Sequence, residues 1–557
     1  MKIQKLLYSS LLGRMVCVAS LLTTVACGDS LLDDMSVNDE IVSGEIAMAE
    51  TKDQAAGMFL QAQSLIHDLR EHKYQYQFNL HIDNYCGYLC LPQNFDGRQP
   101  STYYVNKDFG NGPRQSFFWT AEQTLPVMRG AEKLDLAEIG AMANIMFCYS
   151  AQELADVYGP FPWWDYKIDK QDPPLTYYSV EEIYDSIFVD LKKSITILEN
   201  FNQTTDEHQQ EIMGILQNKD RICGGKIKNW IKFANSLRLR MAMHISVVAP
   251  EKAKAIAREA LQSGVLVSTD KNIEYDITLE GKRNPLEFIS SVWKDTRLNA
   301  SFENLLRRMN SPMLAKWFDK NYDDIKDLKG DVAMGRQSEI IGIRAGLTME
   351  PRSSSNPYDA FSPVSTSYAQ RPVTLMKVVE VLFLQAEAAI RWGEDFTDGM
   401  PAQLLYEDAI YRSFKDEGVA DDVYFEYIGQ VAPKNIDYVD PHDSYNNKAG
   451  IVTIGVAWDD NDSRELQLEK IMTQKYIANY PMGLEAWTDI RRTGFPRIFS
   501  VVDDDGDGSI PEGDIIRRIP YPINDDSDRN DIITSAIPLL GRDEQGTRLW
   551  WDTGNLF

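Results

Sequence analysis

The chain has 557 residues, of which 43% are hydrophobic and 25% are charged, a composition that excludes a disordered protein. Its formal net charge is −26 at pH 7, and it has no basic block or arginine-rich arm. These values argue against binding to nucleic acid, and they suit neutral or cationic ligands better than polyanions.

The first predicted element is an export signal over residues 1–26. Lys2 and Lys5 precede an apolar run that ends at Ala26, and small residues before a cut site fit the cleft of a signal peptidase. The next residue, Cys27, is what a lipoprotein peptidase requires, because the thiol carries the lipid. We therefore predict that residues 1–26 are removed and that Cys27 becomes the lipid-bearing N-terminus.

The alternative is a secretory signal peptide with an incidental cysteine. Thr24 stands where the usual lipoprotein motif has Leu. A transmembrane anchor is not expected, because the run from Met15 to Ala26 is shorter than the roughly 20 apolar residues of a membrane span. An acylated N-terminus would hold the chain at a membrane surface instead.

An acidic segment, residues 27–45, is predicted to be an extended tether. A single body follows over residues 46–557 and begins with a helical pattern. Residues 83–120 interrupt that pattern with many glycines, prolines and aromatic residues. They are predicted to form a long insertion, and long ordered loops are usually functional.

The rest of the body is predicted to be rich in helices. Pairs of helices with alanine-rich contact faces predict a helical-repeat scaffold, mainly over residues 46–265 and 373–395. No linker divides the body, so we expect one large α-rich unit with an irregular face. The helical patterns cover residues 121–158, 179–195, 230–247, 251–262, 375–392 and 466–480, and the irregular segments are residues 265–372 and 500–557.

Four cysteines remain after the signal region: Cys86, Cys90, Cys148 and Cys223. No histidine partner at metal-ligand spacing supports zinc. The favoured interpretation is free, buried thiols. A disulfide between Cys86 and Cys90 is the alternative, which an exported compartment would permit.

The tail contains a candidate calcium loop. Asp503, Asp505, Asp507, Ser509 and Asp514 have the spacing of positions 1, 3, 5, 7 and 12 of an EF-hand loop. Glycine follows the third aspartate and permits the sharp turn. Asp at the last position has a shorter arm than the usual Glu. We predict a structural Ca²⁺ site, with a solvated acidic turn as the alternative.

Several segments, in chain order, resemble those of SusD/RagB-like outer-membrane lipoproteins. Residues 230–240 read W-I-K-F-A-N-S-L-R-L-R, and residues 485–496 read E-A-W-T-D-I-R-R-T-G-F-P. Pro160 departs from the family, which has Asp in that turn. The shorter matching segments are residues 158–162, 179–191, 380–388, 474–476, 517–530 and 550–552.

The resemblance implies a mainly α fold with tetratricopeptide-like helix pairs and a large loop-rich ligand face. It implies a lipoprotein on the outer face of the outer membrane of a Bacteroidetes-type bacterium. It also implies a partner, a SusC-like TonB-dependent β-barrel over which the lipoprotein sits as a lid.

The charged residues of these segments, together with Trp487, are predicted to maintain the fold rather than to bind ligand. Their helical spacing explains them as a buried network of ion pairs and stacked rings. The set consists of Arg238, Arg240, Glu485, Trp487, Arg491 and Arg492.

The ligand is predicted to contact the insertion at residues 83–120. Sugar recognition needs flat apolar faces beside groups that bond hydroxyls, and the insertion supplies both. The candidates are Tyr85, Asn94, Phe95, Arg98, Tyr103 and Tyr104. The alternative is that these aromatic residues fill a small core beneath the loop.

No nucleophile motif, zinc-protease motif or phosphate-binding glycine loop is present. We therefore expect a surface protein, not an enzyme, that captures a glycan and delivers it to the barrel. A peptide cargo is the alternative at the same location. A surface glycoside hydrolase is less favoured, because no carboxylate pair stands out.

Overall fold

The computed structural model describes residues 48–95, 99–105, 107–168, 173–201, 206–321, 325–331, 339–347, 349 and 356–557. The chain divides into two compact units, Met1–Glu45 and Ile46–Phe557, and every described element belongs to the second. The predicted export signal, tether and Cys27 lie outside the described residues. None of the described helices is long and apolar enough to cross a membrane.

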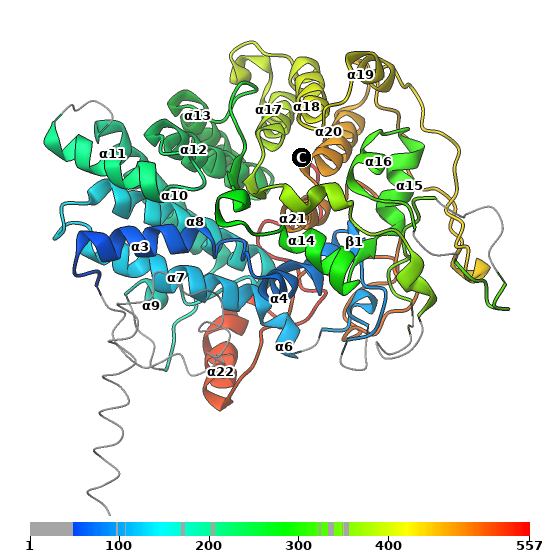
Figure 1. Cartoon of the computed structure of the whole chain (residues 1–557), viewed down its shortest axis with the longest axis horizontal. Helices are drawn as coiled ribbons and strands as arrows, with labels where there is room; N and C mark the ends of the chain where they lie inside the picture. The colour runs from blue at the N-terminus through cyan, green and yellow to red at the C-terminus, as the bar shows by residue number, and fades with distance from the viewer. Residues whose placement is uncertain are drawn as a thin grey trace, which may run out of the picture. The chain divides into compact units, whose positions relative to one another are not determined.

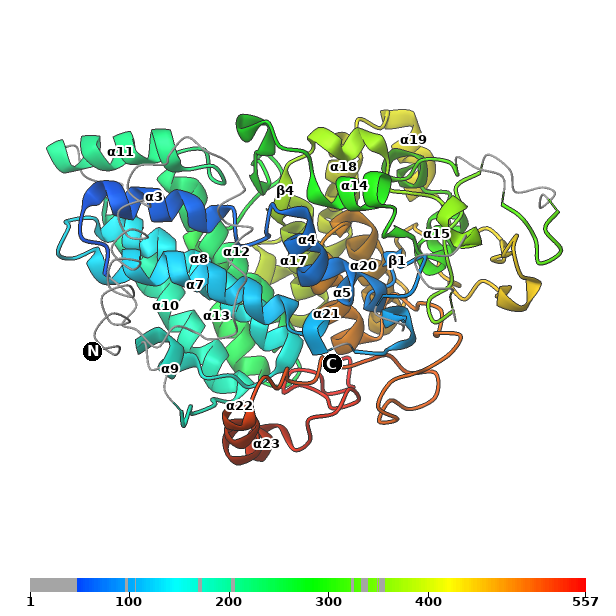
Figure 2. The same ribbon diagram turned by 60° about the horizontal axis from the view of Figure 1, so that its bottom comes forward.

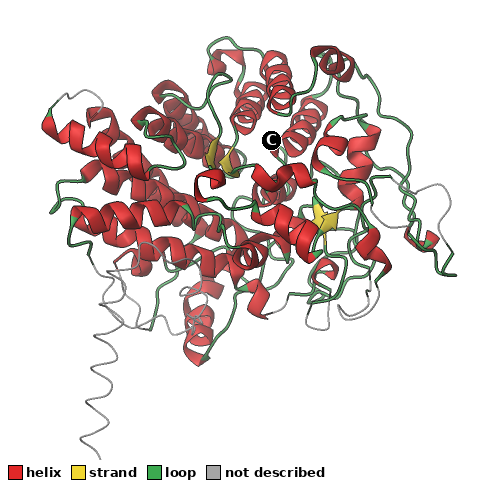
Figure 3. Cartoon of the chain, in the orientation of Figure 1, coloured by secondary structure: helices red, strands yellow, loops and turns green. Residues whose placement is uncertain are grey.

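The first half of this unit is a stack of helix pairs, seen on the left of Figure 1. Helix α8 packs against both α7 and α10, α3 packs against α7, and α12 packs against α13. The fold is mainly α-helical, as predicted (Figure 3). The bounds are α3 Lys52–Gln63, α7 Gly112–Gly130, α8 Ala137–Tyr158, α10 Val180–Phe201, α11 Glu207–Lys219, α12 Ile227–His244 and α13 Pro250–Ser263.

A second helix group is centred on α17, which packs against α18 and α20 and also contacts α12 of the first group. Helix α5 (Ile82–Tyr85) contacts α21, so segments far apart in the sequence lie side by side here (Figure 2). The bounds are α17 Val378–Trp392, α18 Ala402–Asp416, α19 Asp421–Ile428, α20 Arg464–Asn479 and α21 Gly483–Thr493.

Short elements and loops form the remainder. Strand β1 (Leu89–Cys90) pairs antiparallel with β3 (Arg297–Leu298), and β2 (Ile273–Tyr275) pairs antiparallel with β4 (Val373–Met376). The short helices are α4 Glu71–Tyr74, α5 Ile82–Tyr85, α6 Lys107–Gly110, α9 Trp163–Ile168, α14 Pro285–Phe288, α15 Ala300–Arg308, α16 Met313–Trp317, α22 Asp526–Asp531 and α23 Ile537–Leu540.

The predicted insertion is shorter than expected, because α7 already begins at Gly112. Pro113 sits in the first turn of that helix, where a missing N–H costs nothing and the fixed φ suits the helix. Helices α15, α18 and α19 were not predicted. The sequence signals at both ends of α7 are prolines and glycines, which resemble loop signals when read without tertiary context.

The ends of several helices follow their local sequence. Ser179 N and Oγ donate to the Glu182 carboxylate at 2.9 and 2.8 Å, and Glu182 N donates back to Ser179 Oγ at 3.2 Å. This reciprocal cap confirms the predicted start of α10. Helix α8 ends at Gly159, whose φ of 92° is a backbone conformation that favours glycine.

One large hydrophobic core joins both helix groups. Its largest fully buried side chains are tryptophans that come from all parts of the unit: Trp163, Trp230, Trp317, Trp487 and Trp551. Burying such aromatic area dominates the energetics of a core. The core therefore fixes how the two helix groups and the loops are placed relative to one another.

Candidate functional site

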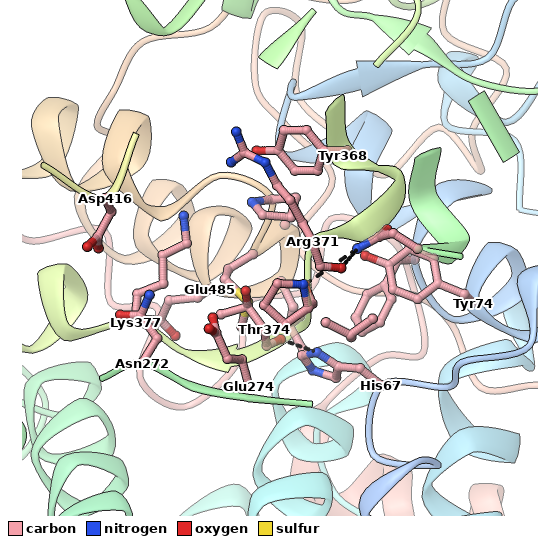
Figure 4. A pocket seen from close by; sticks show the side chains of 18 of the residues that line it. His67, Tyr74, Asn272, Glu274, Tyr368, Arg371, Thr374, Lys377, Asp416 and Glu485 are labelled. Atoms are coloured by element: carbon pink, nitrogen blue, oxygen red, sulfur yellow. Dashed lines mark hydrogen bonds between the residues drawn. The ribbon is translucent and has the colours of Figure 1, made fainter. Parts of the chain in front are cut away.

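A cavity of about 530 Å³ lies where the two helix groups meet the irregular segments (Figure 4). Its walls come from the chain that follows α3, up to and including η1 (Gln75–Asn79). They also come from α8, α12, β2 and β4, from the end of α18, and from the start of α21. This volume lies within the range of small-molecule sites.

His67 is fixed on the cavity wall between two acceptors. Its Nδ1 lies 2.8 Å from the Thr374 carbonyl oxygen, and its Nε2 lies 2.8 Å from Glu153 Oε1. Because a carbonyl oxygen only accepts, Nδ1 carries a hydrogen. The second contact then requires a proton between the ring and the carboxylate, so this pair is already satisfied without a ligand.

Arg371 forms a rigid part of the opposite wall. Its two terminal nitrogens donate to the two Glu417 oxygens, both at 2.7 Å, and its Cζ lies 4.0 Å from the centre of the Tyr368 ring. Burial acts to raise the pKa of Glu417, but the guanidinium outweighs it and holds that pKa below the usual value. Bidentate pairing and stacking leave this arginine little freedom.

Glu274 of β2 and Lys377, which follows β4 directly, line the same cavity (Figure 4). Lys377 Nζ donates to the carbonyl oxygens of Ala478, at 3.0 Å, and of Tyr480, at 2.5 Å. Neither Glu274 nor Lys377 has an ion-pair partner within 4.0 Å among the described residues. Burial raises the pKa of Glu274 and lowers the pKa of Lys377, because each charge is partly desolvated.

Aromatic side chains complete the cavity. Tyr74 and Tyr368 are buried as residues, and within the described part of the chain neither hydroxyl has a hydrogen-bond partner. Phe78 and Tyr149 lie beside them, and the Tyr149 hydroxyl donates to the Leu375 carbonyl oxygen at 2.6 Å. The cavity thus combines aromatic surface with fixed polar groups, which is the combination that orients a polar organic ligand.

Two of the predicted ligand-binding aromatics lie in the core. Tyr85 and Tyr103 are 1% and 4% exposed, and their ring centres are 5.9 Å apart. The Tyr85 ring also packs 5.5 Å from the Trp487 ring. The loop folds back onto α21, so these rings fill core space as the alternative interpretation proposed, and that packing leaves them little surface for a ligand.

The other predicted ligand residues are placed differently. Phe95 is 9% exposed and joins a small cluster with Leu80 and Leu91. Asn94 donates to the Met349 carbonyl oxygen, whereas Tyr104 is half-buried at the surface of the loop. Arg98 lies outside the described residues. Ligand contact by this loop stays a prediction, with Tyr104 its most accessible ring.

The predicted calcium loop does not gather its carboxylates. Asp514 pairs with Arg517, and Asp507 accepts hydrogen bonds from Ser509 and, at 2.8 Å, from Gln545 N. Across the described residues, no group of three or more acidic, histidine or cysteine side chains could hold a metal. Asp503 and Asp505 are exposed. The present arrangement does not fit Ca²⁺, whose binding stays a prediction.

The charged residues of the resemblance segments form a buried network, as predicted. Arg492 donates to both Glu387 oxygens at 2.7 and 2.6 Å, and Lys475 Nζ lies 2.8 Å from both Glu485 and Asp489. Arg491 lies 3.6 Å above the Trp487 ring. Arg238, Arg240, Glu485 and the others are all buried, and Arg240 and Glu485 also reach the cavity wall.

The four described cysteines are free and buried. Cys86 and Cys90 therefore do not form a disulfide, and the free-thiol interpretation is correct. Burial raises the pKa of the Cys90 thiol to about 12. Such a thiol is unreactive at neutral pH.

The sequence did not predict the cavity. Its residues are separated by up to several hundred positions. Those at 271–274 and 371–372 fall in the segment treated as irregular, and those at 373–377 fall in the predicted helical scaffold. One local signal was present: the run Val373-Thr-Leu-Met376 has the β-branched and apolar character of a strand. Only the β2–β4 pairing brings Glu274 and Lys377 to one wall.

Comparison with known proteins gives a consistent result. A family model described as SusD-like, "Susd and RagB outer membrane lipoprotein", matches residues 34–552. No curated protein matches the chain. A solved structure of a chitin-binding SusD homolog from Flavobacterium johnsoniae is 29% identical, with a TM-score of 0.76 over 90% of this chain and 99% of that one.

Two further solved structures are similar over the same span. A SusD homolog from Bacteroides vulgatus is 26% identical, with a TM-score of 0.77 over 90% of this chain and 98% of that one. A SusD homolog from Bacteroides ovatus is 25% identical, with a TM-score of 0.74 over 90% of this chain and 99% of that one.

Proposed function

The chain belongs to the SusD-like family of outer-membrane lipoproteins, and from this premise we propose that it captures a glycan at the cell surface and delivers it to a SusC-like TonB-dependent β-barrel. The proposal includes attachment to the outer leaflet through a lipid on Cys27. Family membership also makes the chain a nutrient-binding protein rather than an enzyme.

The observation that carries the glycan proposal is the cavity. Its aromatic rings and its fixed hydrogen-bonding groups provide the two kinds of contact that a sugar ring needs. The chitin-binding relative supports a saccharide as the class of ligand for this fold.

A panel of neutral oligosaccharides tests the proposal. Isothermal titration of the mature protein should give saturable binding to at least one of them. Tyr74→Phe and Tyr368→Phe each remove one hydroxyl that faces the cavity, so each should weaken binding about threefold to tenfold. Tyr445→Phe is the matched control, because that tyrosine is 82% exposed and lies outside the cavity.

A peptide ligand is the alternative, because the charges of Glu274 and Lys377 would meet the two termini of a short peptide. The panel therefore includes a tripeptide mixture. Binding of peptides without binding of any glycan would favour the alternative and would contradict the glycan proposal.

The loop prediction is tested in the same experiment. Tyr104→Ala should lower glycan affinity if the loop contributes a stacking face, and it should leave the melting temperature unchanged because the ring is only half-buried. If Tyr104→Ala binds glycan as tightly as the wild type, Tyr104 makes no contact with the ligand and the loop prediction loses its most accessible ring.

A further inference from the structure

We infer that the cavity selects an uncharged saccharide, whose neighbouring hydroxyls bridge the Glu274 carboxylate and the Lys377 ammonium. This inference rests on the proposed glycan function and adds the charge and the contacts of the ligand. It follows from which charged groups around the cavity are already paired and which are not.

Most charges in the wall are neutralised within the protein. Arg371 pairs with Glu417 at 2.7 Å, Arg412 pairs with Asp416 at 2.7 Å, and His67 pairs with Glu153. A ligand that used one of these groups would have to break an existing ion pair, which leaves a partly desolvated charge behind. They are therefore suited to shape the wall rather than to bind.

Arg240 and Glu485, at the base of the cavity, are also paired. Arg240 Nε lies 2.6 Å from Glu380 Oε1, and Glu485 Oε1 lies 2.8 Å from Lys475 Nζ. Both belong to the buried network that joins α12, α17, α20 and α21. Lys271 lines the cavity but is exposed, so bulk solvent screens its charge.

Glu274 and Lys377 differ from all of these groups. Each lines the cavity, each is partly desolvated, and neither makes an ion pair with a described residue. The Lys377 ammonium has three donors, of which two go to the carbonyl oxygens of Ala478 and Tyr480. One donor of Lys377 therefore remains for a ligand. The Glu274 carboxylate, on which the Asn272 side chain acts by hydrogen bonding, keeps further acceptor sites for a ligand.

The two charges are of opposite sign, so the free wall is neutral as a whole. A cationic ligand would gain attraction from Glu274 but would meet repulsion from Lys377, and an anionic ligand would meet the reverse. A sugar hydroxyl is both donor and acceptor. Of two neighbouring hydroxyls, one can donate to Glu274 and the other can accept from Lys377, and the net charge of the wall stays zero. Hydrogen bonds to charged groups are stronger than those between neutral groups.

The neutral groups of the wall favour a saccharide over a zwitterion. The hydroxyls of Tyr74 and Tyr368 line the same space without a described hydrogen-bond partner. A ligand with many uncharged hydroxyls can use all of them. A small zwitterion would satisfy only the two charges.

A matched set of β-1,4-linked disaccharides tests the inference. The set holds the neutral N,N′-diacetylchitobiose and cellobiose, the cationic deacetylated chitobiose, and the anionic cellobiouronic acid, with glycylglycine as the zwitterion. Isothermal titration of the mature protein should show tighter binding of a neutral disaccharide than of any charged one. Glu274→Gln should weaken that binding about tenfold to a hundredfold, because it removes the charge from one hydrogen bond.

Glu426→Gln is the matched control, because Glu426 is exposed on α19 and lies outside the cavity. Lys377→Gln should weaken binding in the same way. Its melting temperature is measured in parallel, since Lys377 also holds the end of α20. Glu274 does not hold the end of a helix in this way, so binding by Glu274→Gln tests the inference if Lys377→Gln is unstable.

The outcomes separate the inference from the proposed function. Neutral disaccharide binding that Glu274→Gln leaves unchanged would overturn the inference while the glycan function stands. Tighter binding of the cationic, anionic or zwitterionic probe would also overturn it. Failure of every saccharide in the broader panel to bind would overturn both.

Discussion

Asp83 is 2% exposed, and one of its oxygens accepts a hydrogen bond from Asn79 Nδ2. The other oxygen lies against Gly483, where an added Cβ would be 2.2 Å away. Burial raises the pKa of Asp83 to about 7 from its ordinary value of 3.8, although the Asn79 hydrogen bond acts in the opposite direction. A single side chain thus makes the stability of the fold depend on pH near neutrality.

The Asp83→Asn variant tests this dependence. Between about pH 4 and pH 7 the folded protein holds a proton that the unfolded chain has lost, so the free energy of unfolding falls as pH rises through that window. The wild type should lose up to about 4 kcal/mol relative to Asp83→Asn between pH 4 and pH 8. Urea unfolding at both pH values measures the difference.

The control for this measurement is Asp395→Asn, at an exposed position. Its difference from the wild type should be nearly the same at both pH values. A constant difference for Asp83→Asn as well would mean that Asp83 does not hold its proton in the folded state.

At the scale of elements, helices α17, α20 and α21 are joined by buried ion pairs. Glu387 of α17 receives Arg492 of α21 through both oxygens and Arg391 at 2.8 Å. Burial acts to raise the pKa of Glu387, but the two guanidinium groups outweigh it and lower that pKa to about 2. The helices are therefore held in register by charges that have no access to solvent.

Removing one partner of this pair should be costly. Arg492→Met removes one of the two arginines that pair with the buried Glu387 carboxylate. We therefore expect the free energy of unfolding at pH 7 to fall by about 3–5 kcal/mol. The double variant with Glu387→Gln should lose much less than the sum of the single changes, since the uncompensated charge is gone. Urea unfolding of the four proteins completes the cycle.

The free energy of unfolding measured at acid pH gives a second test of the same ion pair. Because the folded pKa of Glu387 is depressed, its contribution is present above about pH 4.5 and is lost as pH falls towards 2. Arg542→Met, which changes a side chain that is 77% exposed, should shift stability by less than about 0.5 kcal/mol. Additive losses in the cycle would contradict direct coupling.

At the scale of the whole molecule, the two compact units have different tasks in the proposed function. The unit Ile46–Phe557 carries the cavity, whereas the preceding residues carry the predicted lipid site at Cys27. A net charge of −26 repels an anionic membrane surface, so attachment should depend on the lipid.

The Cys27→Ser variant tests this dependence. Without the thiol no lipid can be attached, so the exported protein should move from the membrane fraction to the soluble fraction and lose labelling by a palmitate analogue. Cys17→Ser, within the same segment, should leave both unchanged. Membrane attachment of Cys27→Ser at the wild-type level would contradict the lipidation prediction.

The sequence alone determined the features that depend on nearby residues. Helical spacing predicted α12, α13 and α20 to within a few positions, and the Ser179–Glu182 cap predicted the start of α10. These signals are local, because a helix repeats every 3.6 residues and its caps lie within one turn. The ordered series of segments also identified the family.

Only the tertiary structure decided which side chains line the cavity. An aromatic residue in a loop has the same sequence signal whether it packs inward or outward. The fold buries Tyr85 against α21 and Tyr103 against Tyr85. Glu274 and Lys377 share a wall because β2 and β4 pair across about a hundred residues. Burial, and the absence of a partner for a charge, are properties of contacts distant in sequence, and no local pattern contains them.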